Sequence, residues 1–157
     1  SDSANLTVVA HDNYSDIGLC EITNLKITNQ RSRIEDYFTD CVNGLKYIEI
    51  DGTYRAIGKC AFLGRRFEAS TIPASVTWID EYAFDQSNIK RVYGGNNIRT
   101  IGRAAFADTD LEYFEIPEAL ETLGSFAFAG VNLTEVVFHD KLVEVGYQVF
   151  NYSKIKR

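Results

Sequence analysis

The stretch IGRAAFADTD, residues 101–110, decides the fold, because two similar stretches stand 22 residues before it and 22 residues after it. The earlier one reads IDEYAFDQSN and the later one reads LGSFAFAGVN. Each opens with an aliphatic residue and has a phenylalanine five residues later. The phenylalanines at this position are Phe62, Phe84, Phe106, Phe128 and Phe150. A unit of this length cannot bury its apolar side alone, so the period predicts stacked coils with a continuous spine of phenylalanine rings.

The first half of each unit follows a fixed pattern around this phenylalanine. The aliphatic residue that opens it recurs at Ile57, Ile79, Ile101, Leu123 and Val145, preceded by Ile34 after a longer step of 23 residues. The next position holds Gly58, Asp80, Gly102, Gly124 and Gly146. This series predicts a bend with positive φ, which Asp80 would also tolerate, or a point with no room for a Cβ atom. The pair that ends in phenylalanine is predicted to form a tight turn or a single helical turn, with the ring inward.

The second half of each unit shows the alternation of a strand with one buried face. In LEYFEIP, residues 111–117, the spacing points Phe114 and Ile116 into the core and their neighbours outward. The only two prolines of the chain directly follow such segments, where no further N–H is needed for pairing. About six segments of this kind are present. We expect parallel strands from successive coils to stack about 4.8 Å apart.

The repeated phrases resemble a known family. IPASVTWIDEYAF, residues 72–84, and IGRAAFADTDLEYFEIPEALETLG, residues 101–124, are similar to the BspA-like leucine-rich repeats. The resemblance implies a leucine-rich-repeat solenoid, a right-handed curved stack of about six coils of 22–23 residues. It implies a parallel β-sheet on the concave face and turns or short helical turns on the convex face. Residues 1–19 are expected to cap the first coil, and residues 20–157 to form the solenoid with an incomplete last repeat. A β-propeller or a parallel β-helix is the alternative fold.

Composition and motifs argue against several classes of function. The chain has 157 residues and a net charge of −6, whereas nucleic-acid and anionic-membrane binders usually carry a basic excess. No apolar run approaches the roughly 20 residues that span a bilayer, so membrane insertion is not expected. The three cysteines stand 21 and 19 residues apart, which matches no zinc-binding pattern, and they are predicted to be buried as small apolar side chains. His11 and His139 are predicted to be surface residues. We therefore predict no catalytic residue, no metal and no cofactor.

The outward residues of the predicted strands are the candidate binding surface. Those selected as ligand-binding are Tyr47, Glu49, Arg91, Tyr93, Tyr113, Glu115 and Glu135. Tyrosine and arginine are enriched in protein interfaces and often dominate their energetics. The alternative is that these are ordinary exposed strand residues, and the trio Arg91, Tyr93 and Tyr113 is the strongest part of the hypothesis.

The sequence and the resemblance together favour a non-enzymatic recognition or adhesion module. BspA-like proteins are commonly surface or secreted adhesion proteins of host-associated microbes, which implies an extracellular or cell-surface location. The expected partner is a surface or matrix protein of a host or neighbouring cell, or a glycan. A structural spacer or stalk that presents other domains is the alternative. The incomplete last unit predicts either further repeats or a cap formed by the basic C-terminal tail.

Overall fold

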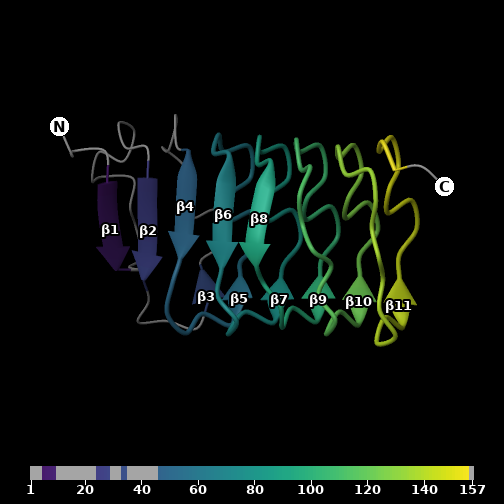
Figure 1. Cartoon of the computed structure of the whole chain (residues 1–157), viewed down its shortest axis with the longest axis horizontal. Helices are drawn as coiled ribbons and strands as arrows, with labels where there is room; N and C mark the ends of the chain where they lie inside the picture. Colours follow the sequence, from purple (N-terminus) through teal and green to yellow (C-terminus); the bar gives the residue numbers. More distant parts are fainter. Residues whose placement is uncertain (1–4, 10–23, 29–32, 35–45, 156–157) are drawn as a thin grey trace.

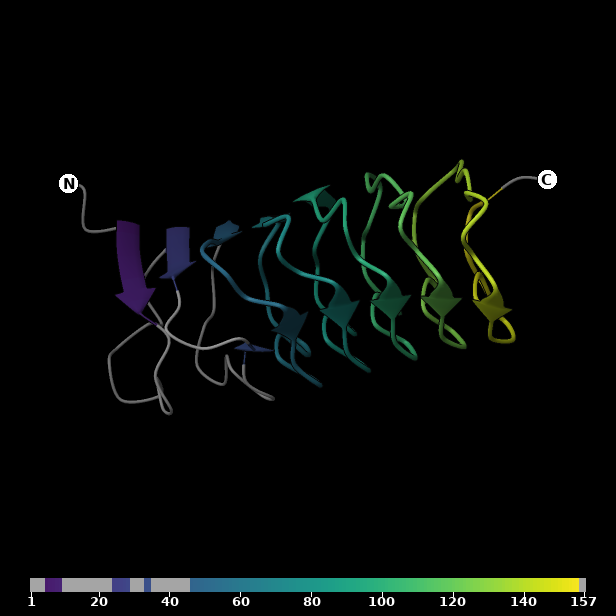
Figure 2. The same ribbon diagram turned by 90° about the horizontal axis from the view of Figure 1, so that it is seen from below.

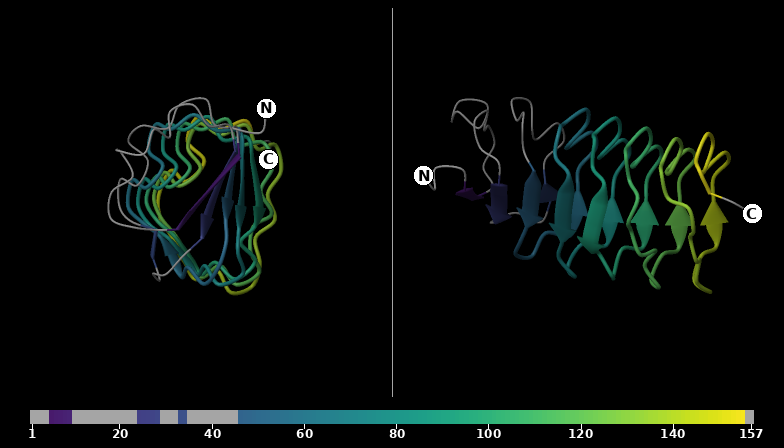
Figure 3. Two further views of the ribbon diagram at one scale, coloured as in Figure 1. Left: turned by 90° about the vertical axis from the view of Figure 1, so that its left-hand side faces the viewer. Right: turned by 45° about the horizontal axis from the view of Figure 1, so that its top comes forward.

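The computed structural model describes residues 5–9, 24–28, 33–34 and 46–155, and these form a parallel β-solenoid of about five turns. Figures 1 and 2 show the strands of successive coils side by side, and in Figure 1 they form two rows, one for each sheet. Seen along the axis in Figure 3, the coils lie over one another, so each part of the repeat builds its own wall. The right-handed, curved form with a concave sheet stays a prediction.

The alternating second half of the repeat builds a five-stranded sheet, here named the long-strand sheet. Its strands, in spatial order, are β1 (Asn5–Val9), β2 (Asn24–Thr28), β4 (Tyr47–Ile50), β6 (Ala69–Ile72) and β8 (Arg91–Gly94). All neighbours pair in parallel. In β2, β4 and β6 every second side chain is buried, as the alternation predicted.

A second parallel sheet, here named the short-strand sheet, was not expected from the sequence. Its two-residue strands, in chain order, are β3 (Arg33–Ile34), β5 (Ala56–Ile57), β7 (Trp78–Ile79), β9 (Thr100–Ile101), β10 (Thr122–Leu123) and β11 (Glu144–Val145). The aliphatic residues that open each phrase are the second residues of these strands. Two residues are too short to show an alternation, so the strand itself left no periodic signal.

The phenylalanine spine is confirmed. Phe62, Phe84, Phe106 and Phe128 are fully buried. Successive rings stack nearly parallel with centroid distances of 5.3, 5.0 and 5.6 Å, and the series ends 5.6 Å further on at Phe150. Stacked or offset aromatic pairs contribute beyond the area they bury, so the spine ties each coil to the next.

Tight turns hold these rings, and no helix is found among the described residues. We name this surface the turn wall: residues 58–65, 80–87, 102–109, 124–131 and 146–153. Within each turn, some N–H groups donate to the carbonyl three residues earlier, as the Ala61 N–H does to the Gly58 carbonyl at 3.1 Å. The residues that alternate with these donate to carbonyls of the next coil, as the Phe62 N–H does to the Ala83 carbonyl at 2.7 Å. Two series of left-handed residues recur in these turns: Cys60, Tyr82, Ala104, Phe126 and Gln148, then Gly64, Gln86, Asp108, Gly130 and Tyr152. The turn wall is therefore a third hydrogen-bonded ladder along the stack.

The glycine position of the phrase is explained by close approach. A Cβ atom on Gly102 would lie 2.7 Å from the Glu81 nitrogen, and one on Gly124 would lie 2.4 Å from the Arg103 nitrogen. Neither glycine has a positive φ, so the expectation of a left-handed bend is wrong here, and the expectation of no room for a Cβ is confirmed.

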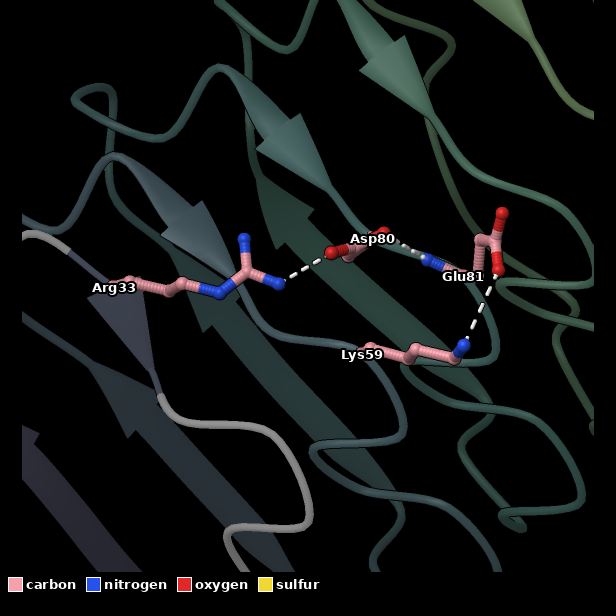
Figure 4. A network of polar contacts seen from close by, with 4 residues as sticks. All are labelled: Arg33, Lys59, Asp80 and Glu81. Carbon is pink, nitrogen blue, oxygen red and sulfur yellow. Dashed lines mark hydrogen bonds and ion pairs between the residues drawn. The ribbon is translucent and has the colours of Figure 1, made fainter. Parts of the chain in front are cut away.

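Asp80 stands at this glycine position and has no positive φ either. Its carboxylate accepts a hydrogen bond from the Glu81 N–H at 2.7 Å and pairs with Arg33 of an earlier coil (Figure 4). The Arg33 guanidinium also lies 5.0 Å from the centre of the Trp78 ring, and Lys59 pairs with Glu81 at 3.7 Å. This network ties together three coils on the side of the short-strand sheet.

Some expectations fall on residues that the structure does not describe. Cys20, Cys41 and His11 lie outside the described residues. Within the expected N-terminal cap, β1 pairs with β2 and extends the long-strand sheet, and its capping role stays a prediction. Cys60 is buried, as predicted.

Candidate functional site

The outward face of the long-strand sheet, here named the strand wall, carries the predicted binding residues in two columns. Cα pairing sets the first column as Asn24, Tyr47, Ala69, Arg91 and Tyr113. The second column is Lys26, Glu49, Thr71 and Tyr93. Of the residues selected from the sequence, Tyr47, Arg91 and Tyr113 lie in the first column, and Glu49 and Tyr93 lie in the second. Glu115 and Glu135 lie beyond the paired strands.

Four of the predicted residues gather at one end of this face, and we name them the aromatic patch: Arg91, Tyr93, Tyr113 and Glu115. The rings of Tyr93 and Tyr113 lie 5.7 Å apart and are 42% and 43% exposed. The Tyr113 hydroxyl donates to Glu115 Oε1 at 3.1 Å, and this hydrogen bond to the carboxylate raises the pKa of Tyr113. Arg91 pairs with Glu112 at 3.6 Å. The patch combines two exposed rings with one cation and one carboxylate.

Tyr47 and Glu49 lie apart from this patch, with β6 between them and β8. The Tyr47 hydroxyl lies 2.5 Å from the Thr71 hydroxyl oxygen. Lys26 lies 3.8 Å from a Glu49 carboxylate oxygen and 3.4 Å from one of Asp51. The pKa of Asp51 is lowered by a hydrogen bond from the Gly52 backbone and then by Lys26. Tyr47 thus contacts a residue of β6 and Glu49 contacts a residue of β2, and both lie apart from the aromatic patch.

The ladder of the long-strand sheet stops at Tyr113. This residue donates to the Lys90 carbonyl at 3.1 Å and accepts from the Val92 N–H at 3.0 Å. Beyond it, residues 114–116 and 135–138 make no backbone hydrogen bond to any described residue. The predicted strand over LEYFEIP is therefore wrong beyond Tyr113. Its alternation comes from packing alone, because Phe114 and Ile116 are buried without pairing.

A cavity of about 750 Å³ opens between these two unpaired segments, and we name it the slot. Its walls include inward-facing Phe114, Ile116 and Val136 together with outward-facing Glu115, Glu135 and Val137. Side chains from both faces line the same space, so the slot runs between the two coils where the ladder is missing. Glu115 and Glu135, which were predicted as separate surface residues, both line this cavity.

Sequence reasoning missed the polar rim of the slot. This rim consists of Asn96, Asn97, Glu118, His139 and Lys141. The stretch YGGNN, residues 93–97, was predicted to be a strand end with a loosened turn, and Gly94 and Gly95 do have positive φ there. The alternation of apolar and polar side chains does not reveal whether a segment pairs with its neighbours through its backbone. The slot could therefore be found only from the three-dimensional structure.

Among the described residues, no group of three or more His, Cys, Asp or Glu side chains is placed to hold a metal ion. In the same part of the chain, no helix is long and apolar enough to cross a membrane.

A 22-residue period, a stacked ring spine and parallel strand ladders define the class as a solenoid repeat protein. The chain belongs to the BspA-type leucine-rich repeat family, whose model matches residues 18–123 and 99–157 with six copies. None of the curated proteins matches the sequence.

A similar fold is found in the crystal structure of a leucine-rich cell surface protein from Faecalibacterium prausnitzii A2-165. The TM-score is 0.69 at 21% sequence identity, over 99% of this chain and 49% of that chain. The chain thus spans about half the length of that protein, and the likeness shows the fold.

Proposed function

We propose that the chain is a non-enzymatic recognition or adhesion module that binds a protein partner through the aromatic patch. The observation that carries this proposal is the gathering of Arg91, Tyr93 and Tyr113 on one exposed face of a repeat scaffold. None of the three belongs to the buried core, so folding does not require their rings or charge. Large amphipathic side chains of this kind are the usual anchors of protein interfaces.

A secreted or cell-surface location fits this function. The chain belongs to the BspA-type repeat family, and the structurally similar protein is described as a leucine-rich cell surface protein. A surface or matrix protein of a host or neighbouring cell is the partner class we propose. The net charge of −6 disfavours nucleic acid as a partner.

A structural spacer is the second candidate, and the turn wall is the observation that favours it. Its ladder joins every described coil from Cys60 to Asn151, and such interlocking suits a stiff stalk. A glycan ligand is a third candidate, since the exposed tyrosine rings offer a surface on which a sugar can stack. The two tyrosines and the arginine favour a protein partner over these alternatives.

A binding screen tests the proposal. The chain is applied to immobilised extracellular-matrix proteins and to a glycan array, and saturable binding to a protein is expected. The variant R91A/Y93A/Y113A should abolish that binding while thermal unfolding stays nearly unchanged. Binding to glycans alone favours the third candidate, and no binding to either array favours the spacer. Unchanged affinity of the variant would overturn the proposed surface.

A further inference from the structure

We infer that the slot binds an extended peptide segment carrying lysine or arginine side chains, which adds a strand between residues 114–116 and 135–138. This inference rests on the proposed function for the class of partner, a protein, and it names the chemistry of the segment that is bound. The slot lies next to the aromatic patch, and Glu115 belongs to both. One partner can therefore contact both sites.

Unpaired backbone is the first argument. In all coils from β2 to β8 the long-strand sheet joins neighbours by a regular parallel ladder. Across the slot, residues 114–116 and 135–138 use none of their N–H or C=O groups in bonds to other described residues. Open strand edges of this kind are templates for pairing with another chain. A strand added between them would form main-chain bonds to both sides, which is a recurrent mode of peptide recognition.

The arrangement of side chains is the second argument. A strand directs alternate side chains to opposite faces. Towards the core, the added strand would meet Phe114, Ile116 and Val136, which line the inner part of the slot. Towards solvent it would meet Glu115 and Glu135. An extended segment with alternating apolar and cationic residues matches both faces.

Charge is the third argument. Glu115, Glu118 and Glu135 bring three carboxylates to the slot, and Lys141 brings one ammonium group. His139 also lines the space, and it adds no charge while it is neutral. The excess of carboxylates favours a cationic occupant and disfavours an acidic one. The volume of about 750 Å³ falls within the usual range of roughly 300–1,000 Å³ for ligand sites.

The test uses the whole chain and a labelled, end-blocked heptapeptide in which lysine and valine alternate. Binding is measured by fluorescence anisotropy at low salt, and the backbone amide NMR signals of residues 114–116 and 135–138 should shift. Two further peptides define the chemistry. One has glutamate in place of lysine, and the other is N-methylated at alternate residues so that it cannot pair as a strand. Neither should bind.

Two variants, each of which replaces three glutamates by glutamines, test whether the peptide binds in the slot. E115Q/E118Q/E135Q should weaken the lysine–valine peptide about tenfold or more, because it removes the carboxylates of the slot. The control E68Q/E121Q/E144Q, whose carboxylates are exposed and outside the slot, should change the affinity by less than about twofold. The inference is overturned if the peptide does not bind, if both variants weaken it alike, or if the N-methylated peptide binds equally well.

This test is independent of the aromatic patch. The variant R91A/Y93A/Y113A keeps all three slot carboxylates and should bind the peptide as the unmodified chain does. If that variant still binds a partner from the screen, the proposed surface fails while the peptide result stands. If the peptide result fails, the proposed surface is still tested by the screen.

Discussion

The turn wall and the strand wall are built from the same repeat, yet they differ in how regular they are. In the turn wall, similar residues recur in each coil. Its ladder of hydrogen bonds continues as far as the bond from the Gly130 N–H to the Asn151 carbonyl oxygen, at 2.7 Å. In the strand wall, the outward residues change from coil to coil, and the ladder ends at Tyr113. The turn wall repeats the same contacts in every described coil that it spans, whereas the outward residues of the strand wall lie outside the buried core and are not held to one pattern.

The largest effect on stability is expected in the phenylalanine spine. Phe106 is fully buried between Phe84 and Phe128, so Phe106→Ala should lower the free energy of unfolding by about 3–5 kcal/mol. Urea denaturation followed by circular dichroism measures this loss. Phe150→Ala is the matched control, because Phe150 is only partly buried at the end of the ring series, and it should cost clearly less. Equal losses would contradict a spine that couples neighbouring coils.

A somewhat smaller effect is expected where two coils approach each other closely in the turn wall. Gly124→Ala places a Cβ atom 2.4 Å from the Arg103 backbone nitrogen and should cost about 2–3 kcal/mol. Gly64→Ala is the matched control: its φ is +67° but nothing lies within 4 Å, so only backbone strain of roughly 1–2 kcal/mol is expected. Chemical denaturation of both variants compares the two causes. The explanation by close approach fails if Gly64→Ala is the more damaging change.

An increase in stability is expected where one coil departs from its neighbours. Asp85 is buried, and its Oδ1 has no hydrogen-bond partner among the described residues. The equivalent positions in the next two coils hold Ala107 and Ala129. Asp85→Ala should therefore raise the free energy of unfolding at pH 7 by about 1 kcal/mol.

This gain should depend on pH. Burial raises the pKa of Asp85 above its ordinary value of 3.8, and the charge of Asp108 acts in the same direction. The ionised form therefore destabilises the fold above the folded-state pKa. The cost disappears as the pH falls through that pKa towards 3.8, so the advantage of Asp85→Ala should shrink in acid. Thermal unfolding from pH 7 to pH 4 measures it. A variant that is less stable than the original chain at pH 7 would contradict the explanation.

The sequence predicted the parts of the fold that repeat. The spacing of Phe84, Phe106 and Phe128 was enough to predict the spine, and the alternation in β4 and β6 was enough to predict which residues face outward. Strands of two residues left no such signal, so the short-strand sheet was missed. The sequence also could not show which segments pair as strands, because Phe114 and Ile116 alternate with outward residues and are buried without backbone pairing. The aromatic patch could thus be predicted, whereas the slot depends on contacts between coils.

The most direct test of the division between the two walls compares two triple variants of matched composition. R91A/Y93A/Y113A changes the aromatic patch, and R103A/Y147A/Y152A changes one arginine and two tyrosines elsewhere. Tyr147 and Tyr152 are 63% and 90% exposed, so the second variant, like the first, should fold.

The deciding measurement is the affinity of both variants for the protein partner found in the screen. We predict that R91A/Y93A/Y113A loses at least about a hundredfold in affinity, as expected when interface anchors are removed, while R103A/Y147A/Y152A stays within about twofold. Equal affinities of the two variants, or a larger loss for R103A/Y147A/Y152A, would contradict the account.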